Sequence, residues 1–242
     1  MRPDAYAEMA ALEDRHWWFR GRRDLLRALL RRAGVDPRRT RVLDAGCGTG
    51  RNLAEFGGVG VDPAPEAVAA CRARGLDVVQ APLEALPFGD ASFDLLLATD
   101  VLEHVDDDVA ALRELRRVAA PGALLLVTVP AHPRLWSAHD EALHHRRRYR
   151  RAELLARVRA AGWEPVVTTW WNAFLLPPIA AARLVRRRSG GTDHGRTPAW
   201  ADGLLRLPLA LEARLVGRGL RLPAGVSLAL ACRPGAQADA QA

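Results

Sequence analysis

The sequence contains no lysine, so arginine alone supplies its 35 basic side chains, and the formal net charge is +7. Such a charge ordinarily favours a polyanionic or membrane-surface partner. Here acidic residues alternate with the arginines along most of the chain, as they do on an ordinary solvated surface. The missing lysine indicates a coding bias, and the charge alone therefore predicts no nucleic-acid partner.

Cysteine is also scarce. Cys47, Cys71 and Cys232 lie far apart and form no CxxC pair, which favours a reducing, cytosolic compartment. The first residues carry no apolar segment of the signal-peptide kind, and no uninterrupted apolar run reaches the roughly 18 residues that a membrane-spanning helix needs. We therefore expect a cytoplasmic protein, with any membrane contact peripheral and on the inner face of the membrane.

Short apolar runs alternate with helical patterns from residue 41 onward, which is typical of βα units around a mostly parallel sheet. Strands are predicted at 41–46, 59–62, 76–80, 93–100, 122–130, 163–171 and 225–233. Proline or acidic residues begin the helical patterns at 63–75 and 106–122, and glycine ends these two and the one at 151–162. The predicted fold class is α/β, with a seven-stranded sheet and helices on both faces.

The chain has 242 residues, 49% of them apolar, which suits one domain with elaborations. The predicted parts are an N-terminal helical cover at 1–40, a core at 41–171 and 225–235, an insert at 172–224 and a disordered tail at 236–242. Residues 186–198, RRRSGGTDHGRTP, are predicted to form a flexible loop. The amphipathic flanks of this loop suit three roles: a substrate lid, a membrane-surface contact or a dimer contact.

The sharpest motif is VLDAGCGTG, which places Gly46, Gly48 and Gly50 directly after a predicted strand. Glycine lets the backbone turn tightly there and approach a ligand closely. A nicotinamide or flavin site of the pattern G-x-G-x-x-G would need glycine where this chain has Arg51. Asp62, at the end of the second strand, suits hydrogen bonds from ribose hydroxyls; alternatively, it only caps the next helix.

Four stretches, VLDAGCGTG, VGVDPAPEAV, EALPFGDASFDLLLATDVLEHVDD and RRVAAPGALLLVTVP, follow the order found in class I S-adenosylmethionine-dependent methyltransferases. The chain resembles this class, specifically the methyltransferase type 11 group. The resemblance implies a Rossmann-like fold with an antiparallel last strand, S-adenosylmethionine as cofactor, S-adenosylhomocysteine as product, and no metal. The cofactor contacts that it implies are Asp44, Gly46, Gly48, Gly50, Asp62, Pro63, Leu83, Glu84 and Thr99.

The chain departs from the family pattern at two places. Many relatives carry aspartate where this chain has Pro82, which puts a contact with the adenine amino group in doubt. The helix after the glycine turn also looks about one turn short. A bacterial subgroup of mostly unassigned substrate is similar over more of the length, including HWWFRGRR, LWSAHDEALHHRRRYRRAEL and the ending from WNAFLLPP to GVSLALA.

The N-terminal aromatic run Trp17, Trp18 and Phe19 is expected to cover the cofactor pocket. Arg20, Arg22 or Arg23 would then pair with a carboxylate or phosphate. Trp18 and Arg23 are counted with the cofactor contacts, and Trp17 with the substrate contacts. The alternative is an ordinary docking helix with a solvated arginine face.

His104, in VLEHVDD, is expected by resemblance to lie near the reactive methyl group. A histidine there suits proton transfer from a hydroxyl nucleophile, because its ordinary pKa is about 6.5. The alternative is that His104 only organises the loop.

The stretch WSAHDEALHHRRRYRR at 136–151 follows the fifth strand, at the edge of the sheet where ligands bind. It lacks the zinc motif H-E-x-x-H, and no second basic motif supports nucleic-acid binding. A solvated hinge stays open, but we favour substrate recognition. The residues that match the subgroup pattern are His139, His145 and Tyr149, predicted to be catalytic with His104, and Asp140 and Arg148, predicted to bind substrate.

The sequence therefore predicts a methyltransferase that acts at oxygen on a small or lipid-like acceptor, with an acidic or phosphorylated group suggested by the arginines and histidines. Quinone-type or secondary-metabolite methylation at carbon or nitrogen is the alternative. Two non-enzyme alternatives are a cofactor-binding partner protein and an RNA-binding module. A monomer and a homodimer are both compatible with the sequence.

Overall fold

The computed structural model describes residues 3–185 and 198–236. Its strands are β1 Val42–Ala45, β2 Val59–Asp62, β3 Val78–Gln80, β4 Phe93–Thr99, β5 Ala119–Pro130, β6 Trp163–Trp171 and β7 Ser227–Pro234. Its helices are α1 Pro3–Leu12, α2 Trp17–Ala33, α3 Arg51–Phe56, α4 Pro65–Ala73, α5 Asp108–Val118, α6 Ala138–Ala142, α7 Arg151–Ala160, α8 Leu176–Val185 and α9 Ala199–Gly217. The predicted strands are confirmed, with β3 shorter and β5 longer than expected.

The seven strands form one sheet in the order β3-β2-β1-β4-β5-β7-β6. The neighbours from β3 to β5 are parallel, and β7 is antiparallel to both β5 and β6. The predicted Rossmann-like fold with an antiparallel last strand is confirmed. The strand order reverses between β1 and β4, and ligands of such sheets bind at the carboxyl ends of the strands at this switch point.

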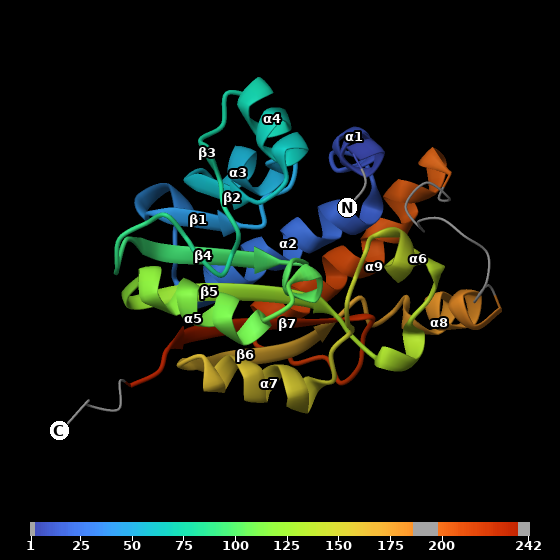
Figure 1. Cartoon of the computed structure of the whole chain (residues 1–242). Coiled ribbons are helices and arrows are strands. Elements are labelled where there is room, and N and C mark those ends of the chain that lie inside the picture. The colour runs from blue at the N-terminus through green and yellow to red at the C-terminus, as the bar shows by residue number, and fades with distance from the viewer. Residues whose placement is uncertain (1–2, 186–197, 237–242) are drawn as a thin grey trace.

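Helices cover both faces of the sheet, α5 and α7 in front and α2 and α9 behind (Figure 1). Leu112 of α5 and Leu154 of α7 belong to the apolar cluster of the first face. Leu26 of α2 and Leu209 of α9 belong to the cluster of the second face. Burying apolar side chains on both faces explains why the central strands are apolar almost throughout.

The predicted N-terminal cover and the predicted insert meet on one face of the sheet. Helix α2 lies within 1–40 and α9 within 172–224, yet the two pack together on the same face of the sheet. A Cβ on Gly21 of α2 would lie 2.5 Å from Leu209 Cδ1 of α9, so glycine permits this close approach. Both segments therefore contribute to the core, while α1, the start of α2 and α8 lie beside the ligand-binding edge.

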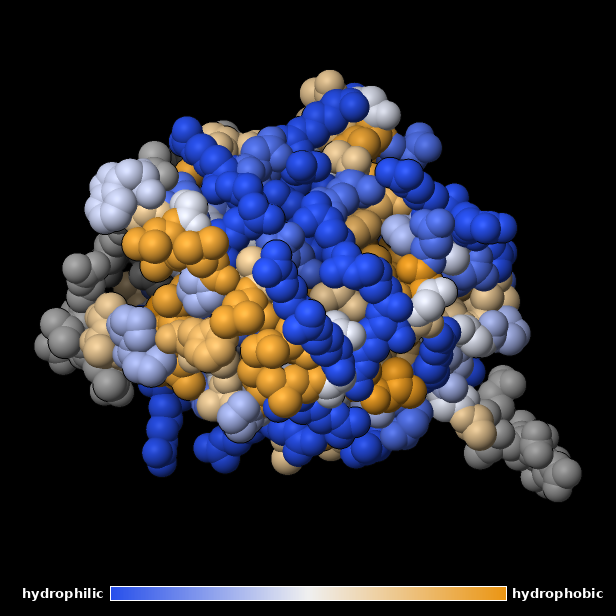
Figure 2. Space-filling view, turned by 180° about the vertical axis from the view of Figure 1, so that it is seen from behind, coloured by the Kyte–Doolittle hydropathy of each residue, from blue (hydrophilic) through white to orange (hydrophobic). Residues whose placement is uncertain are grey.

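Helix α9 also presents an apolar stripe to solvent. Trp200 is 78% exposed, and Leu204, Leu207 and Leu211 are exposed along the same helix. Figure 2 shows apolar residues gathered on this side of the molecule. No helix in the described ranges is long and apolar enough to cross a membrane. The membrane, dimer and lid roles of the insert stay predictions, and the predicted loop at 186–198 and tail at 236–242 lie almost wholly outside the described residues.

Candidate active site

The glycine turn after β1 is a backbone structure tied to β2. The amides of Gly46 and Cys47 donate to the Val61 carbonyl oxygen at 2.8 and 3.0 Å. Gly46 and Gly48 have φ values of 72° and 54°, which side chains with a Cβ rarely adopt. A Cβ on Gly46 would also collide with the Val101 side chain. Only glycine fits this turn without strain.

Asp62, the last residue of β2, holds the turn in place. Its carboxylate accepts the Gly48 amide at 2.9 Å and the Ala64 amide at 3.0 Å. Burial raises the pKa of Asp62, while these two amides oppose that shift. The side chain thus organises the loop before α4, but it does not cap this helix, whose N-cap residue is Ala64. An ionised carboxylate has about four acceptor positions, so two remain for ligand hydroxyls.

A cavity of about 780 Å³ opens beside this turn at the carboxyl ends of β1, β2 and β4. Such a volume lies in the upper part of the roughly 300–1,000 Å³ range of small-molecule sites. Most of the predicted cofactor contacts line it, namely Trp18, Gly46, Gly48, Asp62, Pro63, Leu83, Glu84 and Thr99. Pro82, the departure from the family pattern, lines the cavity too.

Three predicted cofactor contacts do not line the cavity. Gly50 faces the side chains of Cys71 and Leu76, away from the cavity. Arg23 is buried, and its guanidinium lies 3.2 Å from the Glu55 carboxylate and donates to the Glu13 carbonyl oxygen. Arg23 is therefore already bound by two residues of the protein itself, Glu55 and Glu13. The local sequence does not reveal these two partners.

Asp44 is the third of these residues, and it is buried beneath the turn. Its Oδ1 atom lies 3.5 Å from Asn52 Nδ2, and the same amide donates to Thr99 Oγ1 at 3.1 Å. Burial raises the pKa of Asp44 to about 7. Asp44 supports the turn and the end of β4 instead of touching a ligand directly.

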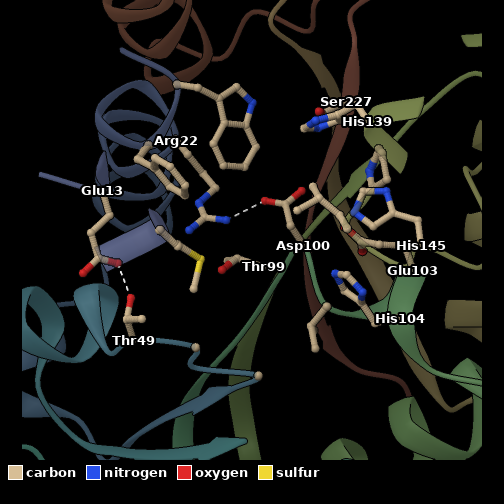
Figure 3. Close-up of a pocket in the computed structure, with 18 of the residues that line it drawn as sticks. Glu13, Arg22, Thr49, Thr99, Asp100, Glu103, His104, His139, His145 and Ser227 are labelled. Atoms are coloured by element: carbon tan, nitrogen blue, oxygen red, sulfur yellow. Dashed lines mark hydrogen bonds and ion pairs between the residues drawn. The ribbon is translucent and has the colours of Figure 1, made fainter. Parts of the chain in front are cut away.

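The N-terminal helices contribute aromatic side chains to the wall of the cavity. Trp17, Trp18 and Phe19 all line it. The Trp17 amide donates to Asp202 of α9 at 3.1 Å, and the Trp18 ring lies 5.7 Å from the Trp171 ring. Below α1, the Thr49 hydroxyl donates to the buried Glu13 carboxylate (Figure 3). The cover is therefore fixed to both the glycine turn and the insert.

Residues 136–151 lie between β5 and α7, as predicted, and Asp140 is their buried centre. Its carboxylate accepts hydrogen bonds from the Ser137 amide at 2.9 Å and from Arg148 Nε at 2.7 Å. The same carboxylate lies 3.0 Å from His145 Nδ1. Burial opposes ionisation, but the His145 and Arg148 contacts outweigh it and lower the pKa of Asp140. Asp140 does not line the cavity, so it positions His145 and Arg148 instead of binding substrate directly.

Tyr149 is fully buried and lies outside the cavity. Its hydroxyl donates to Asp108 Oδ2 at 2.6 Å and contacts the Leu102 carbonyl oxygen at 3.1 Å. Arg157 also binds Asp108. The structure thus gives Tyr149 the role of joining β5, α5 and α7, and the prediction of a catalytic tyrosine is not supported by its position.

The other predicted acceptor-side residues, Trp17, His104, His139, His145 and Arg148, do line the cavity. Sequence reasoning missed their acidic neighbours. Asp100 accepts Arg22 at 2.7 Å and the Thr128 hydroxyl at 2.9 Å, and Glu103 lines the same wall. Both lie in DVLEHVDD, where the acidic residues beside His104 were the available signal.

His104 is a weaker base than the sequence suggested. Burial, followed by the neighbouring His145, lowers its pKa to about 3. The ring is therefore neutral near neutral pH, and its affinity for a proton is low. This environment does not support His104 as the general base.

Residues 43–127 match the methyltransferase domain family model. A probable S-adenosylmethionine-dependent methyltransferase of Mycolicibacterium smegmatis is 33% identical over 163 residues, 63% of this chain and 62% of that protein, which is less than two thirds of its length. An uncharacterized methyltransferase of Mycolicibacterium gilvum is 32% identical over 199 residues, 76% of this chain and 75% of that protein. The chain belongs to the S-adenosylmethionine-dependent methyltransferases.

Solved structures share the fold of this methyltransferase. One titled as a possible histamine N-methyltransferase of Thermotoga maritima aligns with a TM-score of 0.60 at 20% identity, over 96% of this chain and 95% of that one. The [4+2]-cyclase SpnF aligns with a TM-score of 0.54 at 22% identity, over 81% and 74%. These likenesses show the fold alone, and one fold serves different reactions.

The family implies S-adenosylmethionine as the cofactor, and the residues present fit it. The glycine turn offers a surface where a Cβ on Gly46 or Gly48 would collide with side chains. Asp62 would have acceptor positions for ribose hydroxyls, and Pro63 and Leu83, which line the cavity, would offer an apolar wall to the adenine. All of these groups lie at the switch point of the sheet. The resemblance to the family implies that the cofactor binds there.

Proposed function

We propose that this methyltransferase transfers a methyl group from S-adenosylmethionine to a hydroxyl oxygen of a small or lipid-like acceptor. The observation that carries the proposal is a single cavity with two chemically different ends. One end holds the glycine turn and Asp62. The other end holds Glu103, His104 and His145 (Figure 3). A cofactor at the first end leaves space for an acceptor at the second.

The residues of the chain bind, orient and exclude water. When bound, S-adenosylmethionine supplies an electrophilic methyl group on a sulfonium sulfur. Methyl transfer gains most of its rate from alignment, since two reactants held in line react as one molecule. Trp17 and Trp18 close the cavity over the reacting region, and Ile179 of α8 adds an apolar wall. Glu103 and His145 line the acceptor end, where the proton of an acceptor hydroxyl would be released.

The charges of the cavity favour a neutral acceptor over the acidic one that the arginines suggested. Arg22 is paired with Asp100 and Arg148 with Asp140. The carboxylates that line the cavity are Glu13, Asp62, Glu84, Asp100, Glu103 and Asp106, and the lining arginines are Arg22, Arg51, Arg148 and Arg183. Carboxylates outnumber guanidinium groups, so an acidic or phosphorylated acceptor gains no net attraction from the lining.

The test is to incubate the protein with methyl-labelled S-adenosylmethionine and a fractionated extract of its own host, and then to identify the labelled product. We expect an O-methylated neutral product of low molecular mass or lipid character. A product labelled at carbon or nitrogen would rule out O-methylation and favour the alternative, a quinone-type or secondary-metabolite methyltransferase. Cofactor binding with no labelled product in any fraction would favour a cofactor-binding partner protein, and strongly salt-dependent RNA affinity an RNA-binding module.

A further inference from the structure

Three side chains of the kind that bind metals meet at the acceptor end of the cavity. One carboxylate oxygen of Glu103 and one ring nitrogen each of His104 and His145 lie within 4.8 Å of one another. Figure 3 shows the three residues together, on the side of the cavity opposite Glu13 and Thr49. Among residues 3–185 and 198–236, no other group of three histidine, cysteine or acidic side chains converges in this way.

Glu103 carries an uncompensated carboxyl group. The residue is 1% exposed, and neither of its carboxylate oxygens has a hydrogen-bond partner among the described residues. Burying an unpaired carboxylate is strongly unfavourable even after the protein relaxes. Arg22 and Arg148 act on this carboxyl group only at longer range, because Arg22 binds Asp100 directly and Arg148 binds Asp140. A cation bound in the cavity would compensate this carboxylate.

The two histidines are arranged as ligands. Their ring centroids lie 4.8 Å apart at an interplanar angle of 77°. His145 Nδ1 faces Asp140 Oδ1 at 3.0 Å, leaving Nε2 as the ligand atom. A carboxylate on the second ring nitrogen typically fixes the orientation of a metal-binding histidine.

A protonated Glu103 that shares its proton with a histidine is the competing explanation. Burial favours this neutral form, because it raises the pKa of Glu103 well above its ordinary range. Neither oxygen of Glu103 has a hydrogen-bond partner on another described residue. Protonation would remove the charge of Glu103 but would leave both oxygens without partners, so a bound ion accounts for more of the geometry.

We propose that Glu103, His104 and His145 bind a divalent transition-metal ion, such as Zn²⁺ or Mn²⁺. One carboxylate and two imidazoles suit such ions and leave coordination positions open for other oxygen ligands. Ligand atoms of a tetrahedral site lie about 3.3 Å apart at bond lengths of about 2.0–2.1 Å. Side-chain rotations that bring these atoms closer together by up to about 1.5 Å would therefore complete the site.

This proposal replaces the sequence expectation that no metal is bound. The zinc motif considered from the sequence places both histidines on one helix, whereas these ligands come from two segments that meet only in the folded chain. If the proposed function holds, the open positions would take the acceptor hydroxyl oxygen and lower its pKa, with the proton leaving to solvent. Metal binding itself does not rest on the proposed function.

The experiment measures metal binding directly on the full chain after treatment with a chelator. Calorimetric titration with Zn²⁺ and Mn²⁺, and electron paramagnetic resonance for Mn²⁺, should show one ion per chain. Glu103→Gln, His104→Asn and His145→Asn should each weaken binding by at least roughly 100-fold, since even outer partners of ligands contribute about 10–100-fold.

The matched control is His144→Asn, which removes the exposed histidine next to His145. His144 has a φ of 56°, a conformation that asparagine tolerates, so this variant should fold and keep its metal affinity within about threefold. The proposal is overturned if the wild-type chain binds neither ion, if the three ligand variants keep their affinity, or if His144→Asn loses as much as His145→Asn.

Two further readouts separate folding and function from metal binding. Circular dichroism checks each variant, and the ion should raise the unfolding temperature of the wild-type chain but not of Glu103→Gln, which keeps the side-chain volume. S-adenosylhomocysteine binding is titrated separately. A chain that binds metal but not this product would sink the proposed function alone, and one that binds the product but not metal would sink the metal site alone.

Discussion

The cofactor end of the cavity is built from backbone, whereas the acceptor end is built from side chains. At the cofactor end, amides of the glycine turn bind the Val61 carbonyl oxygen and the Asp62 carboxylate within one βαβ unit. At the acceptor end, Arg22, Glu103 and His145 come from three distant segments. The first end therefore depends on local conformation, and the second on buried charged side chains from distant segments, of which Arg22 and Arg148 are paired and Glu103 is not.

This difference predicts how each end responds to substitution. A backbone site fails when a Cβ is added, because φ and space are both restricted. A site of buried charges fails when one partner is removed, because no water reaches the remaining charge to replace the lost partner.

Asp140→Ala should have the largest effect on stability. Arg148 is 4% exposed and would lose its carboxylate partner, so the free energy of unfolding should fall by about 3–5 kcal/mol. Urea denaturation in the presence of a chelator measures the change. The control is Glu164→Ala, which breaks the exposed pair with Arg159 and should cost less than about 1 kcal/mol. Equal losses in the two variants would contradict the account of the acceptor end.

Gly46→Ala against Gly75→Ala tests the cofactor end. The two glycines have φ values of 72° and 69°, so both variants suffer the same conformational penalty of about 1–2 kcal/mol. Only Gly46 also faces a side chain, that of Val101, while nothing lies within 4 Å of a Cβ on Gly75. The collision should add about 1–3 kcal/mol for Gly46→Ala. The same loss in both variants would mean that the turn has space for a side chain.

Asp44→Asn should change the pH dependence of stability. Burial raises the pKa of Asp44 to about 7 in the folded chain, against about 3.9 in the unfolded chain. Between these values the folded state keeps a proton that the unfolded state has released, so the free energy of unfolding falls as pH rises from about 4 to 7. Asn52 and Arg22 favour the ionised form and Asp62 opposes it.

In the Asp44→Asn variant this contribution disappears, while the other buried carboxylates remain. Urea denaturation at several pH values should therefore show a shallower decline than in the wild-type chain, by roughly 1 kcal/mol per pH unit at most. Parallel curves for the two proteins would show that Asp44 is ionised in the folded state throughout this range.

The same contrast explains what the sequence could predict. The strand pattern and the turn with Gly46, Gly48 and Asp62 depend on contacts within one βαβ unit, so local spacing was sufficient. Tyr149 and Arg23 carry the right chemistry for a site but are engaged by Asp108 and Glu55. No local pattern shows that these partners lie there, because tertiary packing brings them together.

The packing of α2 against α9 and the position of Glu103 depend on long-range contacts in the same way. Sequence reasoning selected His104 because histidine titrates near neutral pH. The structure instead buries His104 beside His145 and Glu103, which removes its basicity and creates the cluster. Burial, which decides the chemistry of each of these groups, is a property of the folded chain.

The central claim, one cavity with a cofactor end and an acceptor end, is tested most directly by calorimetric titration of S-adenosylhomocysteine into three proteins. Wild type should bind the product, and Asp62→Ala should bind it at least roughly 100-fold more weakly, because hydrogen bonds to a charged group contribute about 1.5–3 kcal/mol each. Glu103→Gln should keep its affinity within about threefold. Unchanged affinity in Asp62→Ala, or equal losses in both variants, would contradict the division of the cavity.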